Sequence, residues 1–271
     1  MEIKLDLRKK VLENAHSYYE KSKKSREKLA GARKALEGTV KKLKKVDEVR
    51  GVKYHEIKKP KKREWYEKFR WFFSSDNFLV IGGKDATSNE ILIKKYTETN
   101  DLVFHADIQG APFFVIKNPY GKEIPESTLK ETAEAAGSYS KAWKSGIGNC
   151  DIYYVKPEQV SKTAESGEYI PKGGFMIRGH KNWFKNVELK IAIGFNPDTY
   201  EVIGGPVSAI EKNSMYHVVI GIGDKKSKEL AEETMKFIKK RTNKEDGMKI
   251  NAINIDEIQR FIPGNGRILS K

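Results

Sequence analysis

The sequence predicts an α+β protein: a mixed, largely antiparallel sheet domain with flanking helices, preceded by a long helical arm. Two observations lead to this prediction. Over the first fifty residues, apolar side chains recur at three-, four- and seven-residue steps, which is typical of an amphipathic helix. From Trp65 onward, short β-rich runs separated by Gly, Pro and Asn replace that pattern, and helical segments interrupt them without a regular strand–helix alternation.

The charge of the protein is large and unevenly distributed. The 271 residues carry a formal net charge of +15, and with 38% hydrophobic residues they can bury one good core or two small ones. Counting along the chain gives 22 Lys or Arg and 10 Asp or Glu from Met1 to Glu64, a net of +12. Such an excess indicates a partner rich in phosphate, although a solvated helix face with i,i+4 ion pairs also explains many of these charges.

Composition also bounds the compartment. Cys150 is the only cysteine, so an internal disulfide and a cysteine-cluster metal site are excluded, and we expect its thiol to be packed or half-exposed. No apolar run approaches the roughly 20 residues that cross a bilayer, and the N-terminus lacks the apolar centre of a secretory signal. We therefore expect a cytoplasmic protein without a membrane partner.

The arm occupies residues 1–50. Residues 3–7 alternate like a short strand, and a helix is expected from about Lys10 to Arg50. At about 1.5 Å per residue this helix would be some 60 Å long, so we expect it to project and to pair with a partner helix. Its imperfect coiled-coil seam consists of Leu12, Tyr19, Leu29, Leu36, Val40 and Leu43, with Arg26 and Arg33 interrupting.

A basic linker over residues 51–64 follows, which could lie along a nucleic-acid backbone. We then expect a domain over 65–194 and a C-terminal α/β extension over 195–271 packed on it. Helices are predicted over Ser88–Tyr96, Ser127–Lys144, Lys226–Arg241 and Ile255–Phe261, the first capped by Asp85 or Thr87. Strands are predicted in the runs WFFSSDNFLVIGG, DLVFHADIQGAPFFVIKN, CDIYYVKPEQV, GFMIRG, VELKIAIGFN, TYEVIGG and MYHVVIGIG.

Two motifs are candidates for a catalytic or cofactor site. The glycines of LVIGGKDA lack the Gly-Lys-Ser/Thr of a P-loop and the third glycine of a dinucleotide site, so no nucleotide cofactor is expected. His105 and Asp107 should leave one face of a strand, where they could bind a proton, a metal or a ribose-phosphate. The remaining histidines lie in unrelated contexts, which argues against a metal site. A nuclease or hydrolase stays an alternative, with Ser161 or Cys150 as the nucleophile.

The run QVSKTAESGEYIPKGGFMIRGHKNW favours RNA instead. It places Lys162, Lys172, Arg178 and Lys181 around four glycines, with aromatic residues nearby. Cations and stacking surfaces on a pliable backbone are what proteins use to recognise single-stranded or looped RNA. A hairpin with ordinary exposed lysines is equally compatible with this composition.

Three long motifs together resemble the RNA-binding NFACT-R module of the NFACT ribosome quality-control family, which includes RqcH and NEMF. They are KREWYEKFRWFFSSDNFLVIGGKDATSNEILIKKY, DLVFHADIQGAPFFVIKN and EQVSKTAESGEYIPKGGFMIRGHKNW. The stretch IKLDLRKKVLENAHSYYEKSKKSREKL is similar to the later part of the family's coiled-coil region. The chain after about Trp183 is similar to the C-terminal extension of archaeal members.

This resemblance implies a non-enzymatic protein that recognises large ribosomal subunits obstructed by peptidyl-tRNA and helps recruit tRNA for template-free tailing of the stalled chain. The family's NFACT-N domain, helix-hairpin-helix domain and first coiled-coil arm have no counterpart in this sequence. We therefore expect the chain to be the C-terminal part of a longer protein and not to sustain tail elongation alone.

The resulting hypothesis is direct binding to rRNA or tRNA without a cofactor. His105 and Asp107 would position the glycine-bordered strand or touch a ribose. The alternative is a coiled-coil interaction scaffold without direct RNA recognition. The candidate phosphate contacts are Arg63, Arg70, Lys84, Lys94, Lys95, Lys162, Arg178 and Lys181.

Overall fold

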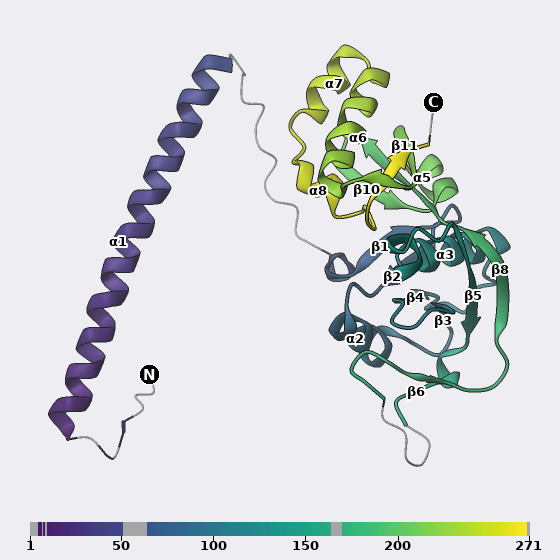
Figure 1. Cartoon of the computed structure of the whole chain (residues 1–271), viewed down its shortest axis with the longest axis horizontal. Coiled ribbons are helices and arrows are strands. Elements are labelled where there is room, and N and C mark those ends of the chain that lie inside the picture. The colour runs from purple at the N-terminus through teal and green to yellow at the C-terminus, as the bar shows by residue number, and fades with distance from the viewer. Residues whose placement is uncertain (1–4, 7, 9, 51–63, 164–169, 270–271) are drawn as a thin grey trace. The chain divides into compact units, whose positions relative to one another are not determined.

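The computed structural model describes residues 5, 6, 8, 10–50, 64–163 and 170–269, and the chain divides into two compact units, Met1–Lys62 and Arg63–Lys271 (Figure 1). The described part of the first unit contains one helix, α1 (Val11–Arg50), where the sequence predicted it. The expected strand over residues 3–7 lies mostly outside the described residues, and the two that are described, Leu5 and Asp6, are not in a strand. Of the expected basic linker, only Glu64 is described.

The start of α1 is capped from within the chain. The Asn14 side chain accepts a hydrogen bond from the Asp6 backbone N–H and donates one to the Asp6 carbonyl, both at 2.9 Å. The Glu13 carboxylate accepts one from the Lys10 backbone N–H. These bonds serve backbone groups next to the first turn, where helical partners are missing. Five side chains of the predicted seam are exposed, from 42% for Val40 to 83% for Leu12, and the sixth, Leu43, lies outside the described side chains.

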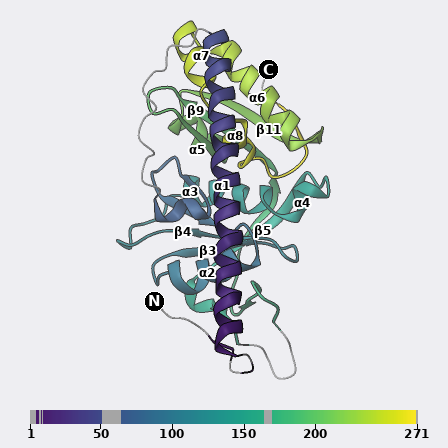
Figure 2. The ribbon, with the colours of Figure 1, turned by 90° about the vertical axis from the view of Figure 1, so that its left-hand side faces the viewer.

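The second unit is built on a six-stranded sheet in which every neighbouring pair is antiparallel. The edge strands are therefore β1 and β8. The strand pair β3–β4 lies in the middle of the sheet, and Figure 2 labels it together with the neighbouring β5. The fold class is thus the one predicted. In sheet order the strands are β1 (Arg70–Phe73), β2 (Leu79–Gly82), β4 (Phe113–Ile116), β3 (Leu102–Ala106), β5 (Asn149–Val155) and β8 (Asn182–Glu188).

Both faces of this sheet are covered. Phe104 and Phe114 point to the face where α3 (Glu126–Ser138) contributes a row of buried alanines. Their strand neighbours, such as Val103 and Phe113, pack on the opposite face with Leu92 of α2 (Ala86–Tyr96). Because side chains alternate along a strand, the central strands need apolar residues on both faces, and they have them. The predicted cap of α2 is Asp85, whose carboxylate accepts from the Ser88 backbone N–H at 2.8 Å.

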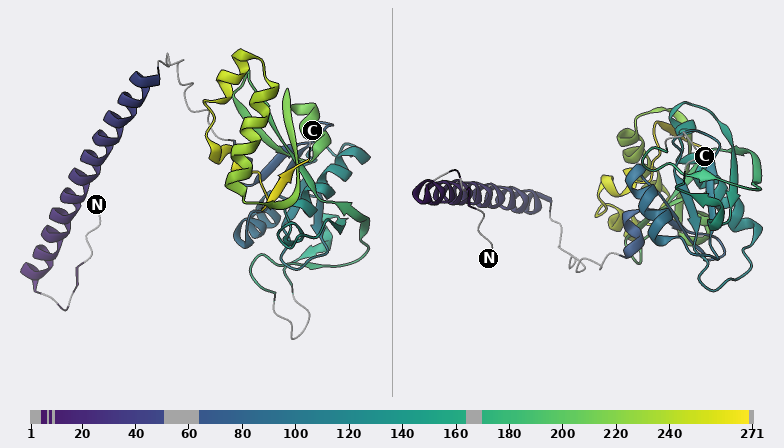
Figure 3. Two further views of the ribbon diagram at one scale, coloured as in Figure 1. Left: turned by 45° about the horizontal axis from the view of Figure 1, so that its top comes forward. Right: turned by 90° about the horizontal axis from the view of Figure 1, so that it is seen from below.

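A four-stranded antiparallel sheet and most of the later helices form the rest of this unit. Figure 3 shows the helices after residue 226, coloured yellow-green to yellow, gathered on one side of this unit. Leu189 alone separates β8 from β9, so the chain passes directly from one sheet to the other. The second sheet runs β10 (Glu201–Gly205), β9 (Lys190–Asn196), β11 (Tyr216–Lys225), β12 (Gly266–Ile268). Its helices are α5 (Val207–Asn213), α6 (Ser227–Arg241), α7 (Lys244–Ile250) and α8 (Ile255–Gln259).

Short elements complete the chain, and several of them were not predicted. The helix expected over Ser127–Lys144 is broken, because Ser140 caps a separate turn, α4 (Lys141–Lys144), by accepting from the Ala142 backbone N–H. Strand β8 and helices α5 and α7 were not predicted either. β8 carries polar residues on both faces, and each of the two helices has only seven residues. The remaining elements are the 3-10 turns η1 (Trp65–Lys68) and η2 (Pro157–Gln159), and the strand pair β6 (Val160–Ser161) and β7 (Met176–Ile177).

Two side chains beside α3 have pKa values raised by burial. The Cys150 thiol lies against Gly137, and burial, reinforced by the Asp151 carboxylate, raises its pKa to about 11. Burial also raises the pKa of Glu134 on α3 to about 7, with Lys190 opposing the shift. The thiol is therefore protonated at neutral pH, whereas Glu134 titrates there.

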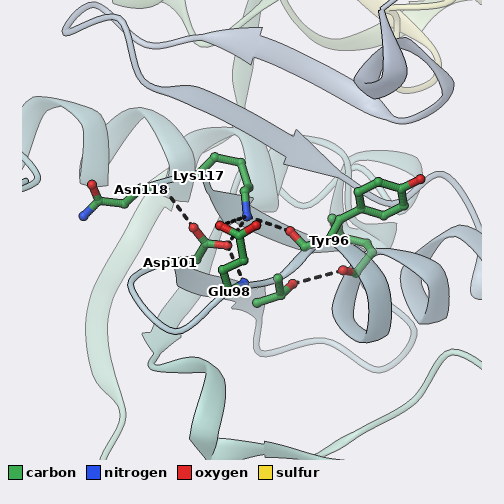
Figure 4. A network of polar contacts seen from close by, with 7 residues as sticks. Tyr96, Glu98, Asp101, Lys117 and Asn118 are labelled. Carbon is green, nitrogen blue, oxygen red and sulfur yellow. Dashed lines mark hydrogen bonds and ion pairs between the residues drawn. The ribbon is translucent and has the colours of Figure 1, made fainter. Parts of the chain in front are cut away.

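A buried carboxylate ties the ends of α2, β3 and β4 together (Figure 4). Asp101, 1% exposed, accepts hydrogen bonds from the backbone N–H groups of Glu98 and Asn118 and forms an ion pair with Lys117. Lys117 also donates to the Tyr96 carbonyl at 2.8 Å and lies 3.4 Å from the exposed Glu98 carboxylate. The carboxylate and the ammonium are thus each satisfied by more than one partner, which a buried charge requires.

We expect Asp101→Ala to lower the free energy of unfolding by about 3–5 kcal/mol, because it leaves the Lys117 ammonium buried without its main partner. Glu98→Ala removes the other carboxylate near the same lysine, but this side chain is 64% exposed, so its loss should cost at most about 1 kcal/mol. Urea unfolding of both variants measures the difference. Equal losses would show that burial does not distinguish the two contacts.

Candidate nucleic-acid interface

The edge strand β8 presents a row of cations around a tryptophan. Lys181 directly precedes β8 and alternates with Trp183 and Lys185, so the three side chains leave the backbone on one face. The Lys185 Nζ lies 4.0 Å and the Lys181 Nζ 5.7 Å from the centroid of the Trp183 ring. Trp183 is 39% exposed and contacts Tyr153 on β5 edge to face at 5.2 Å. We call these four residues the β8 cluster.

His105 lies next to this cluster and is partly buried. Its ring is 4.5 Å from the Phe113 ring, and its Nδ1 is 3.5 Å from the Tyr153 hydroxyl. Burial lowers the pKa of His105 to about 4, and the nearby Asp107 carboxylate only partly opposes this. Asp107 itself is exposed just beyond the end of β3. At neutral pH His105 is therefore an uncharged packing residue and offers no positive charge to a phosphate.

The segment before β7 docks on the start of α2. Gly173 has φ +78°, and its N–H donates to the Glu90 carboxylate at 3.2 Å. A Cβ atom at Gly173 would come within 2.5 Å of the Ala86 Cα, so this close approach requires glycine. Glu90 also pairs with Lys94 at 2.6 Å and lies 3.7 Å from Lys162. One carboxylate thus organises two of the predicted phosphate contacts and partly neutralises them.

Lys162 is further fixed by backbone. Its Nζ donates to the carbonyls of Pro171 and Gly174, both at 2.9 Å, and lies 5.1 Å from the Phe175 ring. Phe175 in turn meets Phe113 edge to face. Lys162 therefore stabilises the conformation of this segment and also contributes positive charge to it.

The other predicted contacts are dispersed. Arg178 is exposed and donates to the Thr163 carbonyl at 3.2 Å. Lys95 is exposed on α2, and the Lys84 Nζ lies 3.5 Å from the Glu67 carbonyl beside η1. Arg63 lies outside the described residues. Arg70 is on β1, at the opposite edge of the sheet from β8, and is largely buried.

Sequence reasoning missed several members of these surfaces. Tyr153 and Lys185 belong to the β8 cluster, and the two-residue spacing of Lys181, Trp183 and Lys185 was the signal that could have found the lysine. Near α2, Trp65 stacks on Tyr96 at 4.9 Å, and the Lys68 Nζ lies 4.1 Å from the same tyrosine ring. These contacts join residues about 30 positions apart, so a local sequence pattern does not predict them.

Comparison with known proteins assigns the domain. Residues 68–179 match the family described as the NFACT protein RNA binding domain. The chain carries an NFACT-R domain. It is 43% identical over 209 residues to the archaeal Rqc2 homolog aRqcH of Methanocaldococcus jannaschii, covering 76% of this chain and 29% of that protein.

Two animal proteins are similar to the same chain. Identity is 41% over 196 residues to the ribosome quality control complex subunit NEMF homolog of Drosophila melanogaster, covering 70% of this chain and 20% of that protein. Identity to human NEMF is 42% over 187 residues, covering 67% of this chain and 17% of that protein. The chain thus spans less than a third of the length of these relatives, whose names describe quality-control factors and imply no catalysed reaction.

The match to the NFACT-R domain includes most of the predicted contacts but ends at Gly179, just before Lys181 and strand β8. Among the residues that the structure describes, no three His, Cys, Asp or Glu side chains gather as metal ligands. No helix in the described ranges is long and apolar enough to cross a membrane. With His105 packed among aromatic rings and the Cys150 pKa raised, no observation favours the hydrolytic alternative.

The pKa shifts of His105 and Glu134 predict opposite slopes of stability against pH. Between about pH 4 and 6.5 the unfolded chain protonates His105 but the folded NFACT-R domain does not, so His105 makes the free energy of unfolding rise with pH. Between pH 4.5 and about 7 the folded domain keeps Glu134 protonated but the unfolded chain does not, so Glu134 makes the free energy of unfolding fall as the pH rises.

We therefore expect the two contributions to offset each other near pH 5–6.5 in the unmodified chain. As the pH rises, the free energy of unfolding of His105→Gln should fall relative to that of the unmodified chain, because the stabilising slope of His105 is lost. The free energy of unfolding of Glu134→Gln should rise relative to that of the unmodified chain. Each difference should change by up to about 1.4 kcal/mol per pH unit. Chemical unfolding at half-unit pH steps tests both; parallel profiles for all three proteins would contradict the assignment.

Proposed function

We propose that this chain is the RNA-binding part of a ribosome quality-control factor and that the β8 cluster is its principal RNA contact. One observation carries the proposal: a half-exposed tryptophan stands between two lysines on the edge strand that directly follows the match to the RNA-binding family. Lys162 and Arg178 would extend the positive surface, and Lys84, Lys94 and Lys95 would add contacts near α2.

The chemistry of the cluster fits single-stranded or looped RNA. A base that stacks on an exposed aromatic ring contributes about 1–3 kcal/mol whatever its identity. The Lys185 ammonium pairs with the half-exposed Asp151 carboxylate at 2.8 Å, and a phosphate that accompanies the base would take the place of that carboxylate. The Lys181 ammonium, 4.4 Å from the Tyr153 ring, would turn toward the same backbone. Because phosphate contacts release counterions, binding should depend steeply on salt and weakly on sequence.

A finer role extends this proposal. We propose that the full-length protein recognises large ribosomal subunits obstructed by peptidyl-tRNA and helps recruit tRNA for template-free C-terminal tailing. The rRNA and the tRNA are then the partners of the NFACT-R domain. Homology over most of this chain to proteins named for ribosome quality control supports this role.

A second function is favoured by α1. Leu12, Tyr19, Leu29 and Leu36 are each more than half exposed along a helix of 40 residues, as an unpaired coiled-coil strand would be. In the scaffold alternative this helix binds a partner helix, and the globular unit only anchors it. Retention of RNA binding by residues 65–271 alone would reject this alternative; its loss, together with loss of ribosome association on removing residues 1–50, would support it.

The deciding experiment is co-sedimentation of the chain with purified large ribosomal subunits, with and without peptidyl-tRNA, over a salt titration. Lys181→Ala with Lys185→Ala should reduce the slope of log K against log salt by roughly 1.5, since each phosphate contact contributes about 0.7–0.9. Trp183→Ala should lower the affinity by about 1–3 kcal/mol and leave that slope unchanged.

The matched control is Lys228→Ala with Lys240→Ala, which removes the same charge from exposed positions on α6. If the control reduces the slope as much as the β8 variant does, binding reflects net charge and the assigned surface is wrong. Preference for obstructed subunits would place part of tRNA recognition in this chain, whereas equal binding to both would limit it to rRNA.

A further inference from the structure

A small cavity lies where edge strand β1 meets the second sheet. It has a volume of about 50 Å³, with Arg70 and Phe72 of β1 on one side and Gly204 of β10 and Phe261 on the other. Tyr139 closes it, and its hydroxyl donates to the Phe261 carbonyl at 2.8 Å. The cavity is therefore built from segments that are far apart in the sequence.

Arg70 carries a charge into this cavity without a carboxylate to balance it. Among the described residues nothing accepts a hydrogen bond from its buried Nε, and no ion pair involves its guanidinium. The face of the Tyr139 ring lies 4.4 Å from the Arg70 Cζ and attracts the charge weakly. Burial lowers the pKa of Arg70, which shows how poorly its charge is solvated there.

The entrance carries more positive charge. Lys84 and Arg260 both line the cavity and are exposed, so the cavity reaches the surface beside them. The guanidinium of Arg260 lies over the Phe261 ring at 4.6 Å. Glu67 is the one carboxylate among the described lining residues, and its side chain accepts from the Glu64 backbone N–H within the cap of η1. Positive charge thus prevails at both the floor and the mouth.

We propose that this cavity is a binding site for a single phosphate group, held by Arg70 at the floor and Arg260 at the mouth. A buried cation lacking a partner favours an anion strongly, because charges attract more in a low-dielectric interior and the guanidinium fork matches phosphate oxygens. About 10–15 Å³ suffices for one water, so 50 Å³ accommodates a tetrahedral oxyanion but not a nucleoside. Only the phosphate group of a larger ligand would thus enter the cavity.

Two sources share this chemistry: a phosphate of bound RNA, and a free phosphate or mononucleotide. The RNA source rests on the proposed function, while the anion site itself does not. The site is separate from the β8 cluster, since β1 and β8 are opposite edges of the six-stranded sheet. Variants of the two sites can therefore be tested independently.

The test is thermal unfolding of the full chain in increasing inorganic phosphate, with chloride added to keep the ionic strength constant. We expect a saturable rise in Tm, because a ligand that binds only the folded state stabilises it. Arg70→Met should abolish the rise without lowering Tm in chloride, since it removes an unbalanced buried charge. Arg260→Ala, at an exposed position, should weaken phosphate binding at least about tenfold, and Lys228→Met is the matched control.

The sources are distinguished by competition with one RNA sequence carrying either a 5′-phosphate or a 5′-hydroxyl. If both RNA forms compete with phosphate, the site binds an internal RNA phosphate. If only the 5′-phosphorylated form competes, it binds a terminal RNA phosphate. If neither form competes, it binds a free phosphate or a nucleotide. No phosphate-dependent rise in Tm, or an undiminished rise in Arg260→Ala and in any Arg70→Met protein that folds, overturns the site. RNA binding that depends on Lys181 and Lys185 would still stand in that case, so the two proposals fail separately.

Discussion

The burial of both faces of the β3–β4 strand pair is the constraint on which the rest of the globular unit depends. Val103, Phe104, Phe113 and Phe114 alternate between the α2 face and the α3 face, so the middle of the sheet has no position for an exposed polar side chain. Even His105 is held there without charge. Polar chemistry is thereby displaced to the two edges of the sheet, where one neighbour is missing and side chains reach the surface.

The two edges have become different kinds of surface. β8 continues almost at once into the second sheet, and its outer residues stay open, so lysines and a tryptophan stand side by side in water. β1 instead packs against β10, where Gly205 allows the Phe72 side chain to approach. That contact buries Arg70 and makes an enclosed cationic site out of an edge residue. The second sheet therefore does more than add core, because it decides which edge of the first sheet is open.

Much of this arrangement was predictable from local pattern. The α1 helix, the β1–β2 and β3–β4 hairpins and the Asp85 cap follow from periodicity and turn chemistry within short windows. The burial of Arg70 and His105 was not predictable, because it depends on Tyr139, Phe261 and Tyr153, which approach only through tertiary packing. Lys162 looked like a surface cation, but backbone carbonyls twelve or fewer residues away hold it in place. β8 was not predicted, because an edge strand with polar residues on both faces lacks the alternation of apolar and polar residues that indicates a strand.

The single cysteine has a practical consequence for experiments on these surfaces. Since the thiolate is the reactive form and burial keeps Cys150 protonated, maleimide and iodoacetamide reagents should leave it largely untouched at neutral pH. A cysteine introduced at an exposed position such as Lys185 or Arg260 would then be the dominant target without removal of the native one. Fluorophores or spin labels can thus report separately on the open edge and on the cavity mouth of one folded molecule.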